Sequence, residues 1–119
     1  MFIKLNHQSL DVYKVVRELT TGVYTLSVKL PADEKFNMIQ QIRRAVLSVK
    51  LNLAEGSSRK SVTERNRYLE IARGSLVEVD AILETAVDLK YFSLDELKTA
   101  GELLNKCFAM LSNMIKRNG

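Results

Sequence analysis

The sequence has 119 residues, of which 46% are hydrophobic and 27% are charged, with a formal net charge of +4. This length suits one domain, residues 1–119, with a single core, and the lone Cys107 excludes an internal disulfide. No apolar run approaches the roughly 20 residues that span a bilayer, and the N-terminal residues do not resemble a secretion signal. We therefore expect a cytoplasmic protein with no membrane partner.

Apolar residues recur at intervals of three and four along four segments, which predicts an all-α protein. The first helix is predicted at about residues 10–30. Ser9 stands at its expected N-cap, and Pro31 ends it because a proline keeps the preceding residue out of the helical conformation. The second helix is predicted at about residues 33–55. Gly56 follows it, where a helix C-terminus favours a residue that tolerates positive φ.

Two capping boxes, each a serine followed three residues later by a glutamate, predict where the other helices begin. The boxes are Ser61 with Glu64 and Ser93 with Glu96. They precede helices predicted at about residues 62–90 and 94–115, after which the chain is predicted to fray. Short connections force neighbouring helices to run antiparallel, so the expected architecture is an up-down-up-down four-helix bundle.

Charge is distributed unevenly along the chain. Residues 43–73 contain eight basic and three acidic side chains, a net charge of +5, whereas residues 74–102 contain two basic and seven acidic ones, a net charge of −5. The eight candidate nucleic-acid-binding residues are Arg43, Arg44, Lys50, Arg59, Lys60, Arg65, Arg67 and Arg73. On a hairpin of the second and third helices they would follow phosphates without reading sequence. The alternative is that Glu55, Glu64 and Glu70 neutralise part of this row as surface ion pairs.

Residues able to support catalysis or metal binding are scarce. A dimetal site in a helical bundle needs Glu-x-x-His pairs, whereas the only histidine, His7, precedes the first predicted helix. Ser48, Asn52 and Glu55 share a face of the second helix, but no histidine or lysine stands at a matching spacing to act as a base. We therefore expect no metal, no cofactor and no enzymatic activity, and we interpret these three residues as a hydrogen-bonded structural group.

Gly74 is unusual because it lies inside the third predicted helix, where glycine costs about 1 kcal/mol relative to alanine. Together with Ala81 and Thr85 it forms a narrow face of small side chains. Such a face lets another helix approach closely, and that helix belongs either to the same bundle or to a second protomer.

Residues 40–75 resemble a bacterial family of four-helix bundles named for proteins encoded in intervening sequences of large-subunit ribosomal RNA genes. The motifs that carry the resemblance are QIRRA, NLAEG and IARGS. The matching positions are Gln41, Arg43, Arg44, Asn52, Glu55, Gly56, Arg59, Ser61, Glu64, Arg67, Gly74 and Ser75. The chain departs from the family pattern at Arg65, where an aromatic residue is usual, and at Leu89, Lys90 and Tyr91, which stand in place of an LGY-type turn.

The resemblance implies a fold related to the accessory protein of diversity-generating retroelements, a barrel of five protomers that binds nucleic acid and a reverse transcriptase. It therefore implies a homopentameric ring with a basic surface. We expect a non-enzymatic, oligomeric protein that binds RNA or DNA through its second and third helices with weak sequence preference. The alternative is an assembly or adaptor protein whose ring binds another protein, such as a reverse transcriptase, through the acidic part of the third and fourth helices.

Overall fold

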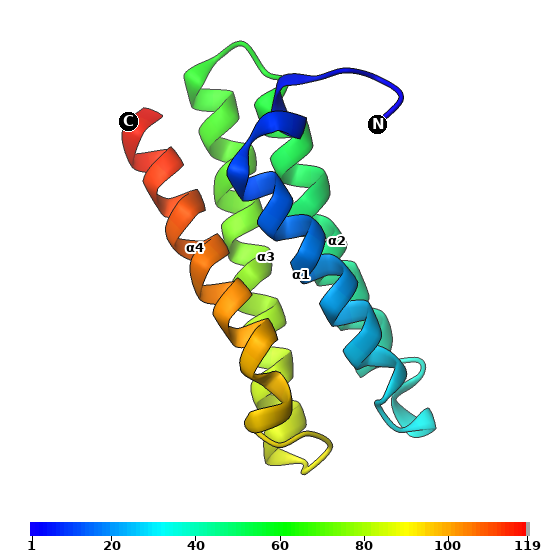
Figure 1. Ribbon diagram of the computed structural model, residues 1–119. Helices are drawn as coiled ribbons and strands as arrows, with labels where there is room; N and C mark the ends of the chain where they lie inside the picture. Colours follow the sequence, from blue (N-terminus) through cyan, green and yellow to red (C-terminus); the bar gives the residue numbers. More distant parts are fainter. Residues whose placement is uncertain (119) are drawn as a thin grey trace.

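A computed structural model describes residues 1–118, apart from the side chain of Ser9. This part of the chain forms four long helices and no strands. The helices are α1 (Asp11–Val28), α2 (Met38–Ser57), α3 (Val62–Asp88) and α4 (Lys98–Asn118), and the 3-10 turns η1 (Asn6–Ser9), η2 (Ala32–Glu34) and η3 (Asp95–Leu97) precede α1, α2 and α4. Successive helices run in opposite directions and α4 lies back against α1 (Figure 1). The predicted four-helix, up-down-up-down topology is confirmed.

The core is built from the apolar strip that each helix carries on one side. Residues spaced by three and four positions share a helix face, so each helix presents a continuous apolar strip to the others. Almost fully buried members of these strips include Val16 and Leu19 of α1, Val46 and Leu53 of α2, Leu76 and Val79 of α3, and Cys107 and Leu111 of α4. Burial raises the pKa of the Cys107 thiol to about 12, so this cysteine packs as a small, neutral apolar residue.

Three helices begin differently from the sequence prediction. α1 begins at Asp11 with Leu10 at its N-cap position, and the side chain of Ser9, the predicted cap, lies outside the described part of the structure. The 3-10 turn η2 occupies the predicted start of the second helix, and α2 begins only at Met38 because Asn37 has non-helical backbone angles, φ −133° and ψ −92°. The turn η3 likewise replaces the predicted first turn of the fourth helix. Apolar spacing does not distinguish such a turn from the α-helix that it leads into.

The two predicted capping boxes form to different extents. At Ser93 and Glu96 the box is complete, since the Glu96 N–H donates to Ser93 Oγ at 3.2 Å and the Ser93 N–H donates to Glu96 Oε1 at 3.0 Å. The hydrogen bond from the Ser93 backbone lowers the pKa of the Glu96 carboxyl. At the start of α3 only half of the box forms, with Ser61 Oγ accepting from the Glu64 N–H at 3.3 Å.

Gly56 is required by close packing and not by an unusual backbone conformation. The sequence predicts a positive φ at the end of the second helix, but none of the described glycines has one, and Gly56 lies inside the last turn of α2. A Cβ atom at this position would lie only 2.8 Å from the Cβ of Tyr68 and 3.3 Å from the carbonyl oxygen of Arg65. The ends of α2 and α3 can approach this closely only because residue 56 has no side chain.

Gly74 has no packing role inside the protomer. Nothing lies within 4 Å of a Cβ atom placed on it, and the residue is exposed on the outer side of α3. Close approach by a helix of the same bundle, one of the two alternatives left by the sequence, is therefore wrong. Contact with another protomer stays a prediction for this face.

The substitutions Gly56→Ala and Gly74→Ala are expected to change stability in opposite directions. A methyl group at position 56 must displace Tyr68 or the backbone at Arg65, and overpacking of this kind costs about 1–3 kcal/mol. A methyl group at position 74 meets open space inside a helix, so it should stabilise the protomer by about 0.5–1 kcal/mol. Urea denaturation measures both changes. Equal stabilities for the two variants would contradict the close approach at Gly56.

The two ends of the bundle carry different connections. One end holds the α2–α3 connection together with both termini, and the other holds the α1–α2 and α3–α4 connections (Figure 1). At this second end Tyr91 Oη donates to Glu34 Oε2 at 3.0 Å, which joins two connections that are far apart in the sequence. Lys90 has a φ of 65°, a left-handed conformation that costs a non-glycine residue about 1–2 kcal/mol. The chain therefore makes this turn with a lysine in the place of the glycine of the LGY-type turn.

Candidate nucleic-acid interface

The eight cations predicted from the sequence do not form one continuous row. The structure divides them among the seam between α1 and α2, the outer face of α2, the region of the α2–α3 connection, and the seam between α3 and α4. Arg43 and Lys50 lie at the α1–α2 seam, and Arg44 lies on the outer face of α2. The group near the α2–α3 connection consists of Arg59, Lys60, Arg65 and Arg67, and Arg73 lies at the α3–α4 seam. The hairpin forms, but its cations project from different sides of it.

Two of these cations pack against tyrosines of α1. Arg43 Nε donates to the hydroxyl of the buried Ser27 at 2.8 Å, and its guanidinium lies 5.1 Å from the centre of the Tyr24 ring. The Lys50 ammonium lies 5.9 Å from the centre of the Tyr13 ring. Cation–π contacts contribute about 0.5–1 kcal/mol at exposed sites, so both side chains stabilise the packing of α1 on α2.

Arg73 has a similar role on the other side of the hairpin. Its Nη1 donates to Ser112 Oγ at 3.2 Å, and its guanidinium lies 5.8 Å from the centre of the Phe108 ring. Both partners belong to α4. Arg73 therefore joins α3 to α4 and does not face the same solvent as Arg43.

Arg59 and Arg65 hold the α2–α3 connection in place. Arg59 pairs with Glu55, one turn earlier, and donates to Tyr68 Oη at 3.2 Å. The hydrogen bond to Glu55 raises the pKa of Arg59 above its already high value, so this guanidinium stays charged. Arg65 Nη1 donates to the backbone oxygens of Arg59 and Lys60 at 3.0 and 2.7 Å, and so satisfies acceptors beyond the end of α2.

The end of α4 adds two cations that the sequence alone predicts to fray. α4 remains helical through Asn118, whose Nδ2 donates to Asn66 Oδ1 in the first turns of α3 at 3.0 Å. Lys116 and Arg117 are therefore held at the same end as the α2–α3 connection, and both are exposed. The sequence could have predicted this position, because an up-down-up-down order brings the end of the fourth helix beside the connection between the second and third helices.

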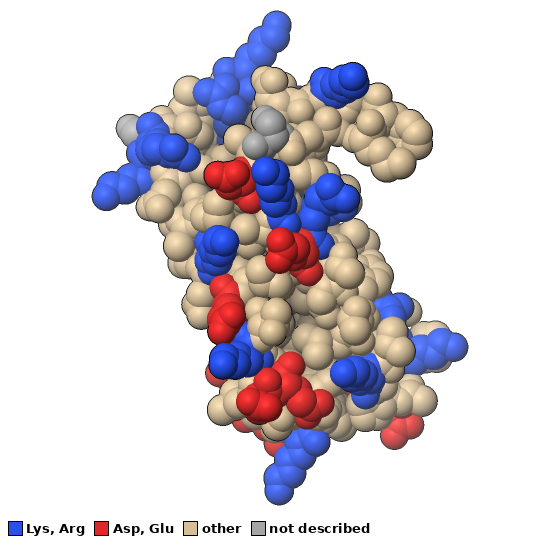
Figure 2. Space-filling view, in the orientation of Figure 1, with Lys and Arg blue, Asp and Glu red and all other residues tan. Residues whose placement is uncertain are grey.

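Four exposed cations of the α2–α3 connection, the start of α3 and the end of α4 have head groups that make no hydrogen bond or ion pair with any described residue. They are Lys60, Arg67, Lys116 and Arg117, and we call them the tip surface. Arg67 also lies 5.8 Å from the centre of the Tyr68 ring. Lys and Arg side chains predominate at this end of the face shown in Figure 2, and most Asp and Glu side chains on that face lie nearer the other end. The tip surface is thus free to contact phosphates.

Asn52 takes part in a polar contact between α2 and α3. Its Nδ2 donates to the backbone oxygen and the hydroxyl of Ser48 at 2.8 and 3.0 Å, and the Ser75 hydroxyl donates to Ser48 Oγ at 2.8 Å. Ser75 is buried, so these bonds satisfy polar groups inside the helix interface. Glu55 pairs with Arg59 instead, and the three residues expected to form one group are divided between two contacts.

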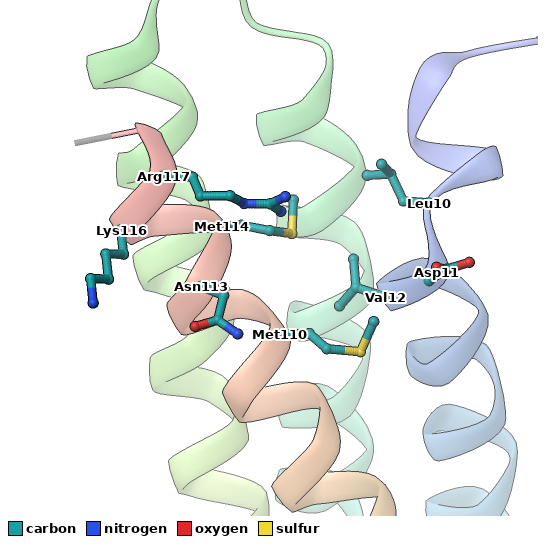
Figure 3. A pocket seen from close by; sticks show the side chains of 8 residues that line it. All are labelled: Leu10, Asp11, Val12, Met110, Asn113, Met114, Lys116 and Arg117. Carbon is teal, nitrogen blue, oxygen red and sulfur yellow. The ribbon is translucent and has the colours of Figure 1, made fainter.

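A cavity of about 650 Å³ lies between the start of α1 and the end of α4 (Figure 3). Met110 and Val12 point toward each other across it, and Arg117 reaches over it, while Lys116 points away. Its lining therefore combines an apolar wall with Asp11 and with two cations of the tip surface, Lys116 and Arg117.

The described part of the chain has no cluster of potential metal ligands. Within residues 1–118, no group of three His, Cys, Asp or Glu side chains is placed to hold a metal ion. The only histidine, His7, is buried edge-on against the Tyr13 ring with ring centres 4.8 Å apart, and burial lowers its pKa. No helix in the same part of the chain is both long and apolar enough to cross a membrane.

Comparison with known proteins extends the resemblance seen at residues 40–75. Residues 8–113 match the family described as 23S rRNA-intervening sequence protein. The chain belongs to this family. A comparison with curated proteins found no match to this chain. Its fold is shared with a crystal structure of a protein of unknown function from the S23 ribosomal protein family of Bacteroides thetaiotaomicron, with a TM-score of 0.81 and 23% identity over 88% of this chain and 98% of that one.

Proposed function

We propose that this intervening-sequence protein is a non-enzymatic, oligomeric protein, without a cofactor, that binds RNA or DNA through the tip surface. The observation that carries the proposal is the separation of its cations into two kinds. Arg43, Arg59, Arg65 and Arg73 donate hydrogen bonds inside the protomer, whereas the head groups of the four tip-surface cations make no hydrogen bond or ion pair within residues 1–118. A cluster of free cations attracts phosphates whatever the base sequence. We therefore expect weak sequence preference.

We further propose that the oligomer is a homopentameric ring, because the sequence resemblance implies a fold related to the accessory protein of diversity-generating retroelements. If all protomers stand the same way up, every tip surface lies on the same side of the ring. Binding by one protomer then raises the effective concentration of the nucleic acid at the others. Four cations on one protomer make a weak site, but five such sets on one face make a strong one.

Fluorescence anisotropy with a labelled RNA hairpin and a labelled DNA duplex tests the proposal. We expect the logarithm of the association constant to fall linearly with the logarithm of the salt concentration, by about 0.7–0.9 for each phosphate contacted. Hairpins of unrelated sequence should bind with similar affinity. Absence of binding at low salt, or an affinity that does not depend on salt, would contradict the proposal.

A further inference from the structure

The outer face of α2 carries two leucines that the described part of the chain leaves partly exposed, Leu47 with 37% of its surface exposed and Leu51 with more. Leu47 and Leu51 stand one turn apart on this face, and 62% of the surface of Leu51 is exposed. Arg44 lies one turn before Leu47, is exposed, and makes no hydrogen bond or ion pair with a described residue. All three residues line one shallow groove. We call Arg44, Leu47 and Leu51 the α2 stripe.

A second exposed apolar surface follows the outer side of α3 and α4, and we call it the α3–α4 groove. Its most exposed apolar residues are Val77, Leu94 and Phe108, with 55, 76 and 43% of their surfaces exposed. Four carboxylates line it, those of Asp80, Glu84, Asp88 and Glu102. Lys98 is the only cation among its described lining residues. None of the four carboxylates has a hydrogen-bond or ion-pair partner within residues 1–118.

We propose that the α2 stripe of one copy of this chain docks in the α3–α4 groove of the next copy. The argument is charge complementarity: the stripe joins leucines to an unpaired cation, and the groove joins apolar residues to unpaired carboxylates. The complement of each surface is therefore present in the same chain. This inference rests on the oligomer of the proposed function and names the two faces that build it. Because the faces differ, the contact is head-to-tail and passes from copy to copy.

Hydrogen bonds inside the protomer show which parts of the two faces lie at the same height along the bundle. Ser75 of α3 donates to Ser48 of α2, and Arg73 of α3 donates to Ser112 of α4. Each pair marks about the same level on two antiparallel neighbours. Because neighbouring helices are antiparallel, moving one residue toward the N-terminus of one helix reaches the same height as moving one residue toward the C-terminus of its neighbour. Each such move changes the height along the bundle axis by about 1.5 Å.

Counting from these pairs brings the apolar and charged parts of the two faces to matching heights. Leu47 lies within one residue of the level of Val77, which is level with Phe108 across the groove. Arg44 lies within one residue of the level of Asp80. A neighbour standing the same way up thus meets its complement without a shift along the bundle axis. A ring requires such a contact, because a shift would produce a helical filament.

Two double variants, each with one altered face, test this assignment by sedimentation equilibrium. Arg44→Glu with Leu51→Asp alters the α2 stripe, and Val77→Asp with Phe108→Asp alters the groove, all at exposed positions. Each variant alone is expected to have the mass of one protomer. An equimolar mixture is expected to have the mass of two, because one intact stripe can enter one intact groove and the chain of contacts then stops.

A control variant with Thr21→Asp and Thr25→Asp adds the same number of carboxylates to the exposed side of α1 and is expected to keep the wild-type mass. The assignment of the faces would be overturned if either double variant still assembled to the wild-type mass. It would also be overturned if the two variants, when mixed, kept the mass of one protomer. Both results would leave the oligomer itself in place. A wild-type protein with the mass of one protomer would overturn the oligomer itself and leave the groove to a basic segment of a different protein. Circular dichroism of each variant verifies its helix content.

Discussion

Reversing the four tip charges is expected to reduce the affinity for an RNA hairpin about 10³- to 10⁴-fold near 0.1 M salt. The variant combines Lys60→Glu, Arg67→Glu, Lys116→Glu and Arg117→Glu. Each phosphate contact contributes about eightfold at 0.1 M salt relative to 1 M salt through counterion release, and four lost contacts multiply. The four head groups have no hydrogen-bond or ion-pair partner within residues 1–118, so the fold should persist. Anisotropy titrations measure the loss, and circular dichroism verifies the fold.

A control variant separates a local effect from a change in net charge. It reverses four exposed lysines away from the tip surface, namely Lys29, Lys35, Lys90 and Lys106. We expect this control to lose much less affinity than the tip variant, although both lose the same charge. Equal losses would show that the whole charge of the protein, and not the tip surface, attracts the nucleic acid. Arg59 and Arg65 are left unchanged in both variants because they hold the α2–α3 connection together.

Truncation of Leu53 is expected to destabilise the protomer by about 2–5 kcal/mol. Its side chain is fully buried in the core strip of α2, so Leu53→Ala removes apolar contacts and leaves a cavity. Leu51→Ala, two residues away on the outer face, is the matched control. It should change the protomer's free energy of unfolding by less than about 0.5 kcal/mol while weakening assembly.

Urea denaturation at a protein concentration too low for assembly compares the two leucine variants. The Leu53→Ala midpoint should fall sharply with little change in the slope of the transition, and the Leu51→Ala midpoint should stay close to that of the wild type. Similar losses in both would show that the two faces of α2 are not divided into core and surface as described.

The helices and their order were predictable because the apolar spacing of three and four persists along each one and short connections leave antiparallel packing as the simple solution. Their beginnings were less predictable. Asn37 leaves the helical conformation between η2 and α2, and apolar spacing does not reveal such a break. Gly56 was identified correctly but for the wrong reason, since its need comes from Tyr68 of the next helix.

The candidate site was only partly predictable because cations at similar positions along a hairpin can have different tertiary partners. Arg43 meets Ser27, 16 residues away, and Arg73 meets Ser112, 39 residues away. Neither separation follows from helical periodicity, so the sequence did not show that these arginines are engaged. The position of Lys116 and Arg117 was predictable, since the predicted topology already places the end of the fourth helix beside the connection between the second and third helices.

The mass of the wild-type protein with and without a short RNA hairpin, measured by sedimentation equilibrium, tests the central claim most directly. We predict an assembly of five times the 13.5 kDa of one chain, which gains the mass of the hairpin at low salt and releases it, still assembled, as the salt concentration rises. A species of one chain that binds no hairpin at any salt concentration would contradict both the ring and its basic face.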